Sequence, residues 1–413
     1  PVTAYYFNLV SVIGLLTNVV IVPMAGLVVT GGLVAFFVSL FSKAVAGFLL
    51  AAAGVFIEGI VFLCTPLEKL PYSAVTVATP SLAVVAMYYL GSSLVREMVV
   101  HEAFRAKLRP YGSAVLVGGG LLVGTLFLLA PGGPRPLEIV FLDVGQGDAI
   151  VLHTPQGRTV LVDGGGTPAW QRGDFRVGRD VVVPYLEKKG IRSVDLLIST
   201  HPDTDHVQGL EDVLQAMAVG TVLIPPKEIF AEGYERLLQL ADAKKVPVRE
   251  VAAGDRLRLG EDLEITVLNP PGRGPVFASA PDNNHSLVLQ VRYGSAGIWL
   301  TGDIEIEGLQ RLLEEENLGA CHVFKAPHHG SHTGYYEPFL DAISPVAVVL
   351  SVGRNSFGHP SPQVVRYWEE RGVAVYRTDE HGAVTVVTDG RTMKIIPFIP
   401  GGEKREGAMG RRF

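Results

Sequence analysis

The stretch VDLLISTHPDTDH, residues 194–206, joins a short apolar run to a dense group of metal-binding side chains. Residues 194–199 are expected to form a buried strand, because the run is apolar and ends in a turn signal. Four side chains that can bind a metal follow within six residues, namely His201, Asp203, Asp205 and His206. Polar turn residues after a strand are common, but they do not explain why imidazoles and carboxylates alternate here with residues that cannot bind metal. The pattern therefore predicts a metal site at the edge of a sheet.

The composition divides the chain into two parts. Residues 1–42 carry no Asp, Glu, Lys or Arg, and residues 1–130 hold only six of the 35 basic and four of the 41 acidic side chains. The rest of the chain has the composition of a globular protein. We expect a first domain at 1–130, a Pro- and Gly-rich linker at 131–136, a second domain at 137–398 and a basic flexible tail at 399–413.

Four apolar stretches in the first domain are long enough to cross a hydrocarbon core of roughly 30 Å. They are residues 5–41, 44–64, 74–95 and 113–130. The first is too long for one simple span, and Pro23 and Gly31-Gly32 could break it into a span and a re-entrant or interfacial piece. Buried core helices are the alternative interpretation, but four such stretches so close together favour membrane helices.

Charged residues between the stretches predict the orientation in the membrane. Four basic side chains follow the third stretch, namely Arg96, Arg105, Lys107 and Arg109. Because basic loops stay in the cytoplasm, the fourth stretch would carry the chain outward. We therefore expect a multi-pass protein of the cell membrane with its second domain on the extracytoplasmic face. Cys64 and Cys321 are far apart in the sequence, so neither a disulfide framework nor a cysteine-based zinc site is expected.

The second domain reads as an alternation of apolar strands, helices and short turns, which favours an α/β fold. Several strands end in Asp or His beside Gly or Pro: Asp163, Asp205-His206, Asp303, His328-His329 and His359. Active sites of layered α/β folds lie where strand ends meet loops, so we expect these residues to meet in one site. Asp163 either orients a ligand from outside the metal's own shell or only caps its turn.

Residues 145–148, Gly-Gln-Gly-Asp, lie between two expected strands. No helix follows this Gly-x-Gly pattern, which excludes a dinucleotide-binding fingerprint. The glycines are expected to serve a tight turn. Asp143, Gln146 and Asp148 are expected to line or brace a site nearby.

These motifs together resemble the metallo-β-lactamase superfamily. The strand ending in Asp163, the His-x-Asp-x-Asp-His run, Asp303 after Gly302 and the pair His328-His329 follow the order of that family. The resemblance implies a four-layer αββα sandwich, so the expected fold is a membrane α-helical region followed by such an α/β domain. It also implies a site for two metal ions.

Three further segments resemble the C-terminal domain of ComEC-type DNA-uptake proteins. They are LDVGQGDA at 142–149, Asn284 followed by SLVL at 286–289, and HHGS at 328–331. The apolar first domain is similar to the end of the membrane competence domain of that family. The resemblance therefore covers nearly the whole chain.

The resemblance implies a ligand set for two divalent metal ions. The expected ligands are His201 and Asp203 for the first ion, Asp205 and His206 for the second, Asp303 bridging both, and one of His328 and His329, with His329 favoured. Asp203 stands where the superfamily usually has a second His. The middle-motif His has no clear match, although Asn284 and His285 lie at roughly its place. A carboxylate in place of an imidazole favours Mn²⁺, with Zn²⁺ or Mg²⁺ as alternatives.

The implied chemistry is hydrolysis of a phosphodiester, because two metal ions activate water and neutralise the charge of the reacting oxygens. The expected catalytic residues are Asp163, Asp205, His329 and His359. Either His359 or the member of the His328-His329 pair that is not a ligand would bind the phosphate or protonate the leaving oxygen. The family implies a membrane-anchored nuclease that degrades one strand of incoming DNA, with DNA, the lipid membrane and other uptake proteins as partners. A phosphodiesterase for another outer-surface substrate and a metal-free structural part of a channel are the alternatives.

The charge of the second domain does not by itself indicate nucleic-acid binding. After residue 130 the chain holds 29 basic and 37 acidic side chains, a net charge of −8, whereas nucleic-acid binders usually carry a basic patch. The candidate patches are Arg172, Arg176 and Arg179, or Lys188, Lys189 and Arg192.

Overall fold

The computed structural model describes residues 1–7, 9–11, 13–68, 70, 73–77, 79–101, 106, 135–167, 174–230, 232–272, 277, 281–314, 318–400 and 411–412. The chain falls into two compact units, one made of residues 1–120 with 187–190 and one made of the remainder. The fourth apolar stretch, most of the linker, three of the four basic loop residues, Arg172 and most of the tail lie outside the described residues.

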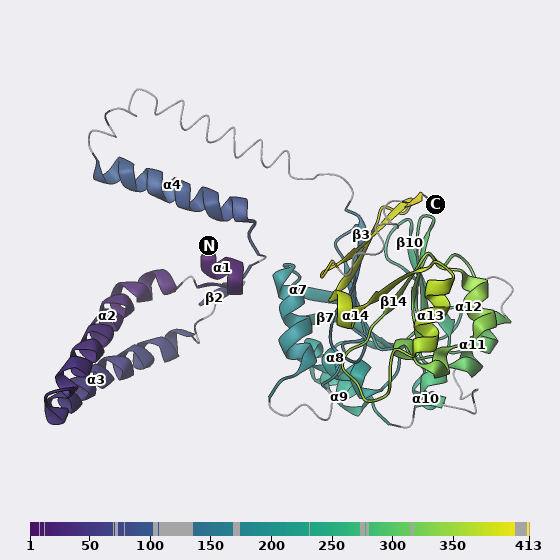
Figure 1. Ribbon diagram of the computed structural model, residues 1–413, viewed down its shortest axis with the longest axis horizontal. Helices are drawn as coiled ribbons and strands as arrows, with labels where there is room; N and C mark the ends of the chain where they lie inside the picture. Colours follow the sequence, from purple (N-terminus) through teal and green to yellow (C-terminus); the bar gives the residue numbers. More distant parts are fainter. Residues whose placement is uncertain are drawn as a thin grey trace. The chain divides into compact units, whose positions relative to one another are not determined.

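The helical unit contains two long helices, α2 (Gly14–Ser39) and α3 (Lys43–Glu68) (Figure 1). By length and composition, both could cross a membrane. The expected break in the first apolar stretch is wrong, because α2 continues through Pro23 and Gly31-Gly32 as one helix. Apolar membrane helices tolerate such residues because neighbouring groups satisfy the freed backbone.

Shorter elements flank these two helices. α1 (Val2–Phe7) precedes β1 (Leu9–Ser11), which pairs antiparallel with β2 (Ala74–Thr76). The third apolar stretch is therefore not helical from its start. Its helix, α4 (Leu82–Val100), begins after Ser81, whose hydroxyl accepts the backbone N–H of Val84 and so caps the first turn.

The C-terminal unit contains two mixed sheets. The first has the order β18-β17-β16-β3-β4-β5-β6-β7-β8. Its strands are β3 (Leu137–Phe141), β4 (Ile150–His153), β5 (Thr159–Val162), β6 (Ser193–Ile198), β7 (Ala218–Ile224), β8 (Val248–Glu250), β16 (Val384–Thr388), β17 (Thr392–Pro397) and β18 (Arg411–Arg412). Strands β5 to β8 run parallel, so their carboxyl ends share one edge.

The second sheet has the order β15-β14-β13-β12-β11-β10-β9. Its strands are β9 (Arg256–Arg258), β10 (Leu263–Asn269), β11 (Val288–Tyr293), β12 (Ala296–Leu300), β13 (Val323–Lys325), β14 (Ala347–Leu350) and β15 (Ala374–Arg377). Strands β12 to β15 are parallel. The elements α13, β15, β16 and β17 follow His359 and complete the domain.

Helices cover the outer face of each sheet (Figure 1). On the first sheet these are α7 (Val183–Lys188), preceded by a π-helical turn (Gly178–Val182), α8 (Thr204–Ala216) and α9 (Glu235–Ala243), with a 3₁₀ turn at Lys227–Ile229. On the second sheet they are α11 (Ile306–Leu313), α12 (Glu337–Ile343) and α13 (Pro362–Glu370), with short α10 (Pro281–Asn284) and α14 (Thr378–His381).

Three apolar cores separate these layers. The central core joins the two sheets through buried side chains such as Leu152 and Ile265. A second core packs the first sheet against α7, α8 and α9, and a third packs the other sheet against α11, α12 and α13. The expected αββα layering is therefore confirmed, and both sheets turn the carboxyl ends of their parallel strands toward loops that carry polar side chains.

Candidate metal centre

The candidate centre is built at the carboxyl ends of strands from both sheets. Asp163 directly follows β5, and His201 follows β6 after a short turn. Asp303 comes shortly after β12, and His329 shortly after β13. Because these strands are parallel to their neighbours within each sheet, their ends deliver the four side chains to one place.

The first turn of α8 supplies Asp205 and His206. This helix begins at Thr204, inside the motif. The motif is therefore only partly a turn, and the helix N-terminus fixes the positions of two of its side chains. Asp203 is the N-cap residue, although its side chain makes no capping hydrogen bond.

Glycines let the loop after β5 lie directly against α8. A Cβ atom on Gly164 would lie 2.3 Å from the backbone nitrogen of Leu210, and one on Gly166 would lie 2.1 Å from the carbonyl oxygen of Thr204. The backbone N–H of Gly164 donates to the carbonyl of His206 at 2.7 Å. Gly164 and Gly166 are therefore required by close backbone approach, and this packing sets the distance between the strand end and the helix.

Asp303 lies at the middle of the cluster. Its Oδ2 atom is 3.3 Å from Nε2 of His206 and 3.2 Å from Nε2 of His329. Nε2 of His329 is also 3.4 Å from Oδ2 of Asp205. Two triads, His201-His206-Asp303 and Asp205-His206-His329, each have one donor atom per residue, all within 4.8 Å of one another. The structure thus brings together five of the residues expected as metal ligands.

The chemistry of this donor set fits a divalent metal ion. The Nε2 atoms of His201, His206 and His329 are buried and have no hydrogen-bond partner among the described residues. Leaving such atoms unsatisfied is costly in a folded protein. A metal ion would accept these lone pairs, and imidazole with carboxylate is a common ligand combination for divalent ions.

Asp163 orients His206, and it also shares a candidate metal-binding triad with Asp148 and His206. Its Oδ2 accepts a hydrogen bond from Nδ1 of His206 at 2.9 Å and from the Thr200 hydroxyl at 2.7 Å, while Oδ1 accepts the Thr200 N–H at 2.8 Å. A donor at Nδ1 leaves Nε2 of His206 free for the metal. Asp163 holds this position with a left-handed backbone, at φ 56°, which Asp tolerates better than most residues.

An unusual backbone conformation directs the side chains of His328 and His329 to different surroundings. His328 and His329 have φ values of 47° and 54°, and successive left-handed non-glycine residues store strain that functional sites often contain. His329 turns inward and donates its Nδ1–H to the carbonyl of Ser351 at 2.9 Å. His328 stays partly exposed, with Nδ1 3.1 Å from Oε1 of Glu305 and Nε2 3.9 Å from Oδ2 of Asp303.

Asp203 and His359 lie at the margin of the cluster. The half-exposed carboxylate of Asp203 is 3.6 Å from Nε2 of His201. The ring of His359 packs edge-on against that of His328, with centroids 5.2 Å apart. Neither residue, nor His328, belongs to a metal-binding triad within the described part of the chain.

Asn284 and His285 lie at roughly the sequence position where the superfamily has its middle-motif His, and both make other contacts. Oδ1 of Asn284 accepts the backbone N–H groups of Glu305 and Gly308, at 3.1 and 2.9 Å, and so supports the start of α11. The ring of His285 packs against Phe277, with centroids 4.8 Å apart. Both residues are buried, and neither belongs to a described metal-binding triad.

Lys325 is a buried cation that the sequence analysis did not identify. Its Nζ lies 2.5 Å from Oδ2 of Asp148 and 3.5 Å from Oδ1 of Asp303, and donates to the carbonyl of Gly302 at 2.8 Å. Asp148, expected only to line or brace a site, joins the cluster in a triad with Asp303 and His329. A lysine within the apolar strand β13 was the available signal, because a buried Lys must be paired.

When no metal is bound, the neighbouring charges favour the charged forms of His206, His329 and Asp303. Burial disfavours the charged form of His329, but Asp303 and Asp205 outweigh it and raise its pKa to about 9. The pKa of His206 is raised well above its usual value in the same way. Burial likewise opposes ionisation of Asp303, yet the neighbouring cations hold its pKa well below its usual value. A metal ion must therefore displace protons from the imidazoles.

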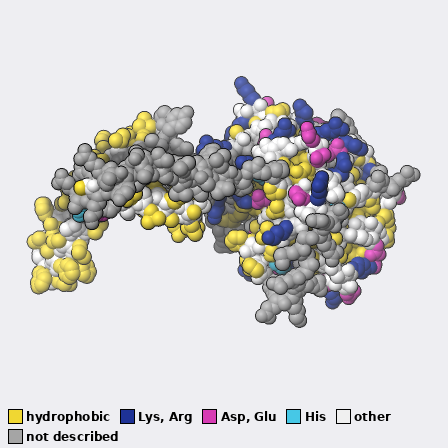
Figure 2. Space-filling model, turned by 90° about the horizontal axis from the view of Figure 1, so that it is seen from above, with side chains coloured by type: hydrophobic (Ala, Val, Ile, Leu, Met, Phe, Trp, Pro, Cys, Tyr) yellow, Lys and Arg dark blue, Asp and Glu magenta, His cyan; other side chains and the backbone are white. Residues whose placement is uncertain are grey.

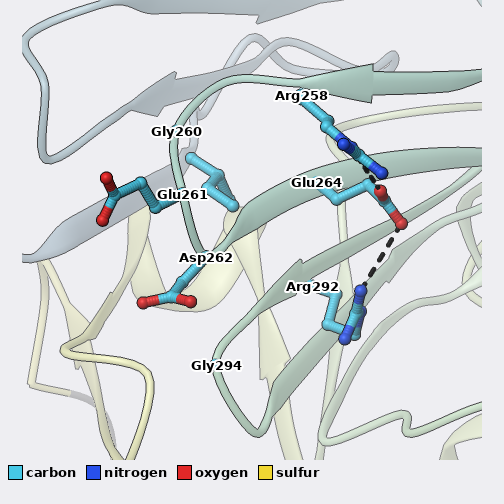
Figure 3. Close-up of a pocket in the computed structure, with 8 residues that line it drawn as sticks. Arg258, Gly260, Glu261, Asp262, Glu264, Arg292 and Gly294 are labelled. Atoms are coloured by element: carbon cyan, nitrogen blue, oxygen red, sulfur yellow. Dashed lines mark hydrogen bonds and ion pairs between the residues drawn. The ribbon is translucent and has the colours of Figure 1, made fainter.

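A separate polar pocket lies at the opposite ends of the second sheet's strands. It is lined by residues of the turns after β9 and β11, and Glu264 lies 3.5 Å from both Arg258 and Arg292 (Figure 3). Strand β12 begins beside this pocket and ends at the metal centre. Three acidic and two basic side chains line it, and none of them belongs to a described metal-binding triad.

The comparisons with known proteins assign the class. Residues 142–354, more than half of the chain, match the Metallo-beta-lactamase superfamily, and the chain belongs to this superfamily. Among solved structures, CmlA, a diiron beta-hydroxylase from Streptomyces venezuelae, is 17% identical with a TM-score of 0.40 over 62% of this chain and 55% of that chain.

Within this superfamily, the similar proteins are competence proteins. Residues 1–96 match the family described as Competence protein. ComE operon protein 3 of Bacillus subtilis (strain 168) is 30% identical over 396 residues, 93% of this chain and 49% of that protein. Competence protein ComA of Neisseria gonorrhoeae is 31% identical over 59% of this chain and 31% of that protein. The chain thus spans half or less of these relatives, and the expected resemblance to ComEC-type proteins is confirmed.

Proposed function

We propose that the chain is a membrane-anchored, metal-dependent phosphodiesterase that hydrolyses DNA during its uptake. The observation that carries this proposal is that three buried imidazole nitrogens, which have no hydrogen-bond partner among the described residues, converge on the carboxylates of Asp205 and Asp303. The Competence match of the helical unit supports DNA as the substrate. The expected extracytoplasmic position of the C-terminal unit belongs to the same proposal.

The proposed centre holds two divalent ions. His201 and Asp203 would hold the first, Asp205, His206 and His329 the second, and Asp303 both. Such ions would supply Lewis acidity that activates water and offsets the charge of a phosphodiester. The mixture of carboxylates and imidazoles favours Mn²⁺ over the softer Zn²⁺.

The residues around the ligands have distinct roles in this proposal. Asp163 keeps His206 in one tautomer, and the Ser351 carbonyl does the same for His329. Lys325 offsets the negative charge of Asp148 and Asp303, which limits the charge available to the ions. These contacts hold the donor atoms in place before substrate arrives.

His359 is suited to bind phosphate more than to donate a proton to the leaving group. Burial, together with the neighbouring His328 and His329, lowers its pKa to about 4. It is therefore a neutral imidazole at pH 7 that offers one N–H to a phosphate oxygen. A general acid would need a pKa nearer to the working pH.

A direct test uses the full chain in detergent, with metal analysis and cleavage assays on linear DNA and on a small phosphodiester. We expect Mn²⁺-dependent cleavage of DNA, two equivalents of bound metal, and loss of both in Asp205→Ala. Cleavage of the small ester but not of DNA would favour the alternative substrate class. A metal-free chain that cleaves neither would overturn the enzyme proposal in favour of a structural role.

A further inference from the structure

An exposed aromatic ring stands beside the candidate centre. Phe357 is 73% exposed and lies in the loop between β14 and α13. In the described part of the C-terminal unit, most large aromatic side chains are buried, and Phe398 is the other Phe that is more than half exposed. A lone exposed apolar residue is ordinary by itself, so the position and rigidity of Phe357 carry the argument.

The loop that presents this ring is held by one side chain. Oδ1 of Asn355 accepts the backbone N–H groups of Phe357 and His359, at 3.0 and 3.1 Å. Its Nδ2 donates to the carbonyls of Gly353 and His359, both at 2.8 Å. Four hydrogen bonds from Asn355 therefore fix the turn with the Phe357 ring outside.

Both ends of the loop are attached to segments of the metal centre. A Cβ atom on Gly353 would lie 2.4 Å from the backbone carbon of Gly145, in the turn that leads to Asp148. At the other end, Ser361 donates its backbone N–H to the carbonyl of Gly330, next to His329. The exposed ring thus has a fixed position relative to the proposed ligands.

A series of rings leads from Phe357 to the metal centre. The centroids of Phe357 and His359 are 5.7 Å apart, and those of His359 and His328 are 5.2 Å apart. Nε2 of His328 lies 3.9 Å from Oδ2 of Asp303. Phe357 is therefore connected through His359 to His328, which lies beside Asp303, the proposed bridging ligand. A base stacked on Phe357 would thus be close to the phosphodiester at the metal centre.

We propose that Phe357 is a stacking platform for a nucleobase that flanks the phosphodiester at the metal centre, so that the site takes single-stranded nucleic acid. This inference rests on the proposed function. Exposed aromatic rings bind single strands by stacking with little sequence preference, because every base has a π-face. Bases within an intact duplex are already stacked on their neighbours and cannot use such a platform.

Phe398 provides a matched control for the ring. It is 81% exposed and follows β17, which is four strands away from β5 in the first sheet, or about 19 Å at the usual strand spacing. Its removal eliminates an equally exposed phenyl ring without touching the loop at residues 353–359.

The experiment uses the full chain in detergent with Mn²⁺. Three substrates of equal length are compared: a single-stranded oligonucleotide, the same oligonucleotide with abasic units, and a hairpin-capped duplex. In Phe357→Ala we expect the KM for single strands to rise by about tenfold or more with a smaller change in kcat. The preference for base-bearing over abasic strands should fall toward one. Phe357→Trp should restore the KM, and Phe398→Ala should match the wild type.

A binding measurement separates this inference from the proposed function. The indole fluorescence of the Phe357→Trp variant, relative to the wild type, is titrated with the single-stranded and the abasic oligonucleotides in EDTA. Quenching by the base-bearing strand alone supports stacking even if no cleavage occurs, in which case only the proposed function fails. Equal KM values for wild type and Phe357→Ala, or equal quenching by both strands, would overturn the stacking proposal while leaving the nuclease intact.

Discussion

The helical unit exposes most of its large apolar side chains, whereas the C-terminal unit buries most of them. In the helical unit Phe41, Phe48 and Phe62 point outward, and hydrophobic side chains cover much of the described surface visible in Figure 2. In the C-terminal unit Trp299 and Trp368 are buried, and charged groups are spread over the surface. The first arrangement is stable only in an apolar medium, whereas the second supplies its own core.

The difference extends to polar groups. The C-terminal unit buries charged side chains together, as in the group of Lys325, Asp148 and Asp303. The helical unit carries few charges, and Glu58 is the one acidic residue within the long candidate spans. Buried charge is costly unless it is paired or binds a metal. The helical unit therefore exposes the apolar surface that suits a lipid environment, whereas the C-terminal unit pairs its buried charges at the candidate metal centre.

The largest expected effect is at the bridging carboxylate. Asp303→Asn should lower bound metal sharply and reduce cleavage by about a thousandfold or more, because the remaining ligands lose their shared anion. Metal analysis and the cleavage assay on the full chain measure both. Asp341→Asn, at an exposed carboxylate paired with Arg371, is the control and should retain metal and activity. Full metal occupancy in Asp303→Asn would contradict the proposed ligand set.

A charge in the helical unit should have the next largest effect. Val29 faces outward from α2, and Val29→Lys should make insertion of this helix less favourable by about 2.5–3.5 kcal/mol at the centre of a bilayer. A translocon insertion assay measures that free energy, with Val29→Leu as the control. Phe398→Lys, at an exposed position of the C-terminal unit, should leave its thermal unfolding unchanged. Equal insertion free energies for Val29→Lys and Val29→Leu would contradict the inference that α2 lies in an apolar medium.

A smaller loss is expected at the residue that orients His206. Asn adopts the left-handed backbone of Asp163 readily, so Asp163→Asn should keep the turn but weaken Mn²⁺ binding by about 10- to 100-fold. Titration calorimetry on the full chain measures the affinity. Asp195→Asn, whose carboxylate accepts the Thr159 N–H, should bind Mn²⁺ as the wild type does. An unchanged affinity in Asp163→Asn would reduce Asp163 to a cap of its own loop.

The smallest effect concerns the metal-free protein and pH. The pKa of His329 is raised to about 9 in the folded state, and that of His206 is raised as well. Their contribution to stability is fully present below the unfolded value near 6.5 and is lost as pH rises through the folded pKa. We expect the Tm of the metal-free C-terminal unit to fall by a few degrees between pH 6.5 and 9. Mn²⁺ should remove this fall, because metal binding strengthens as the imidazoles lose protons; a Tm that rises with pH in EDTA would contradict the assignment.

Local patterns in the sequence were sufficient for many elements and for the cluster's members. The strand predicted at 194–199 corresponds to β6 (Ser193–Ile198), and the motif residues His201, Asp205, His206, Asp303 and His329 do converge. The start of α8 at Thr204 was not predicted, because Pro202 and the polar residues after it are typical of a turn. Polar residues also favour the first turn of a helix, so that signal was ambiguous.

Long-range pairing could not be predicted in the same way. β16 pairs with β3 across most of the domain, with Val384 opposite Phe141, and no local pattern specifies such a partner. The pairing of Lys325 with Asp148 also joins distant segments. Its only sequence signal was a charged residue in an apolar strand.

The amino-acid sequence was sufficient to predict that an apolar region with few charges precedes an α/β domain, and that imidazoles and carboxylates follow strand ends in a metal-binding order. These properties are local, since they depend on composition and on periodicity along the chain. The tertiary structure alone decided that Asp163 turns to His206, that His329 faces inward while His328 stays partly exposed, and that Phe357 stands rigidly outside. Those outcomes depend on which strand ends meet and on which backbone conformations the contacts hold, and only the packed chain fixes both.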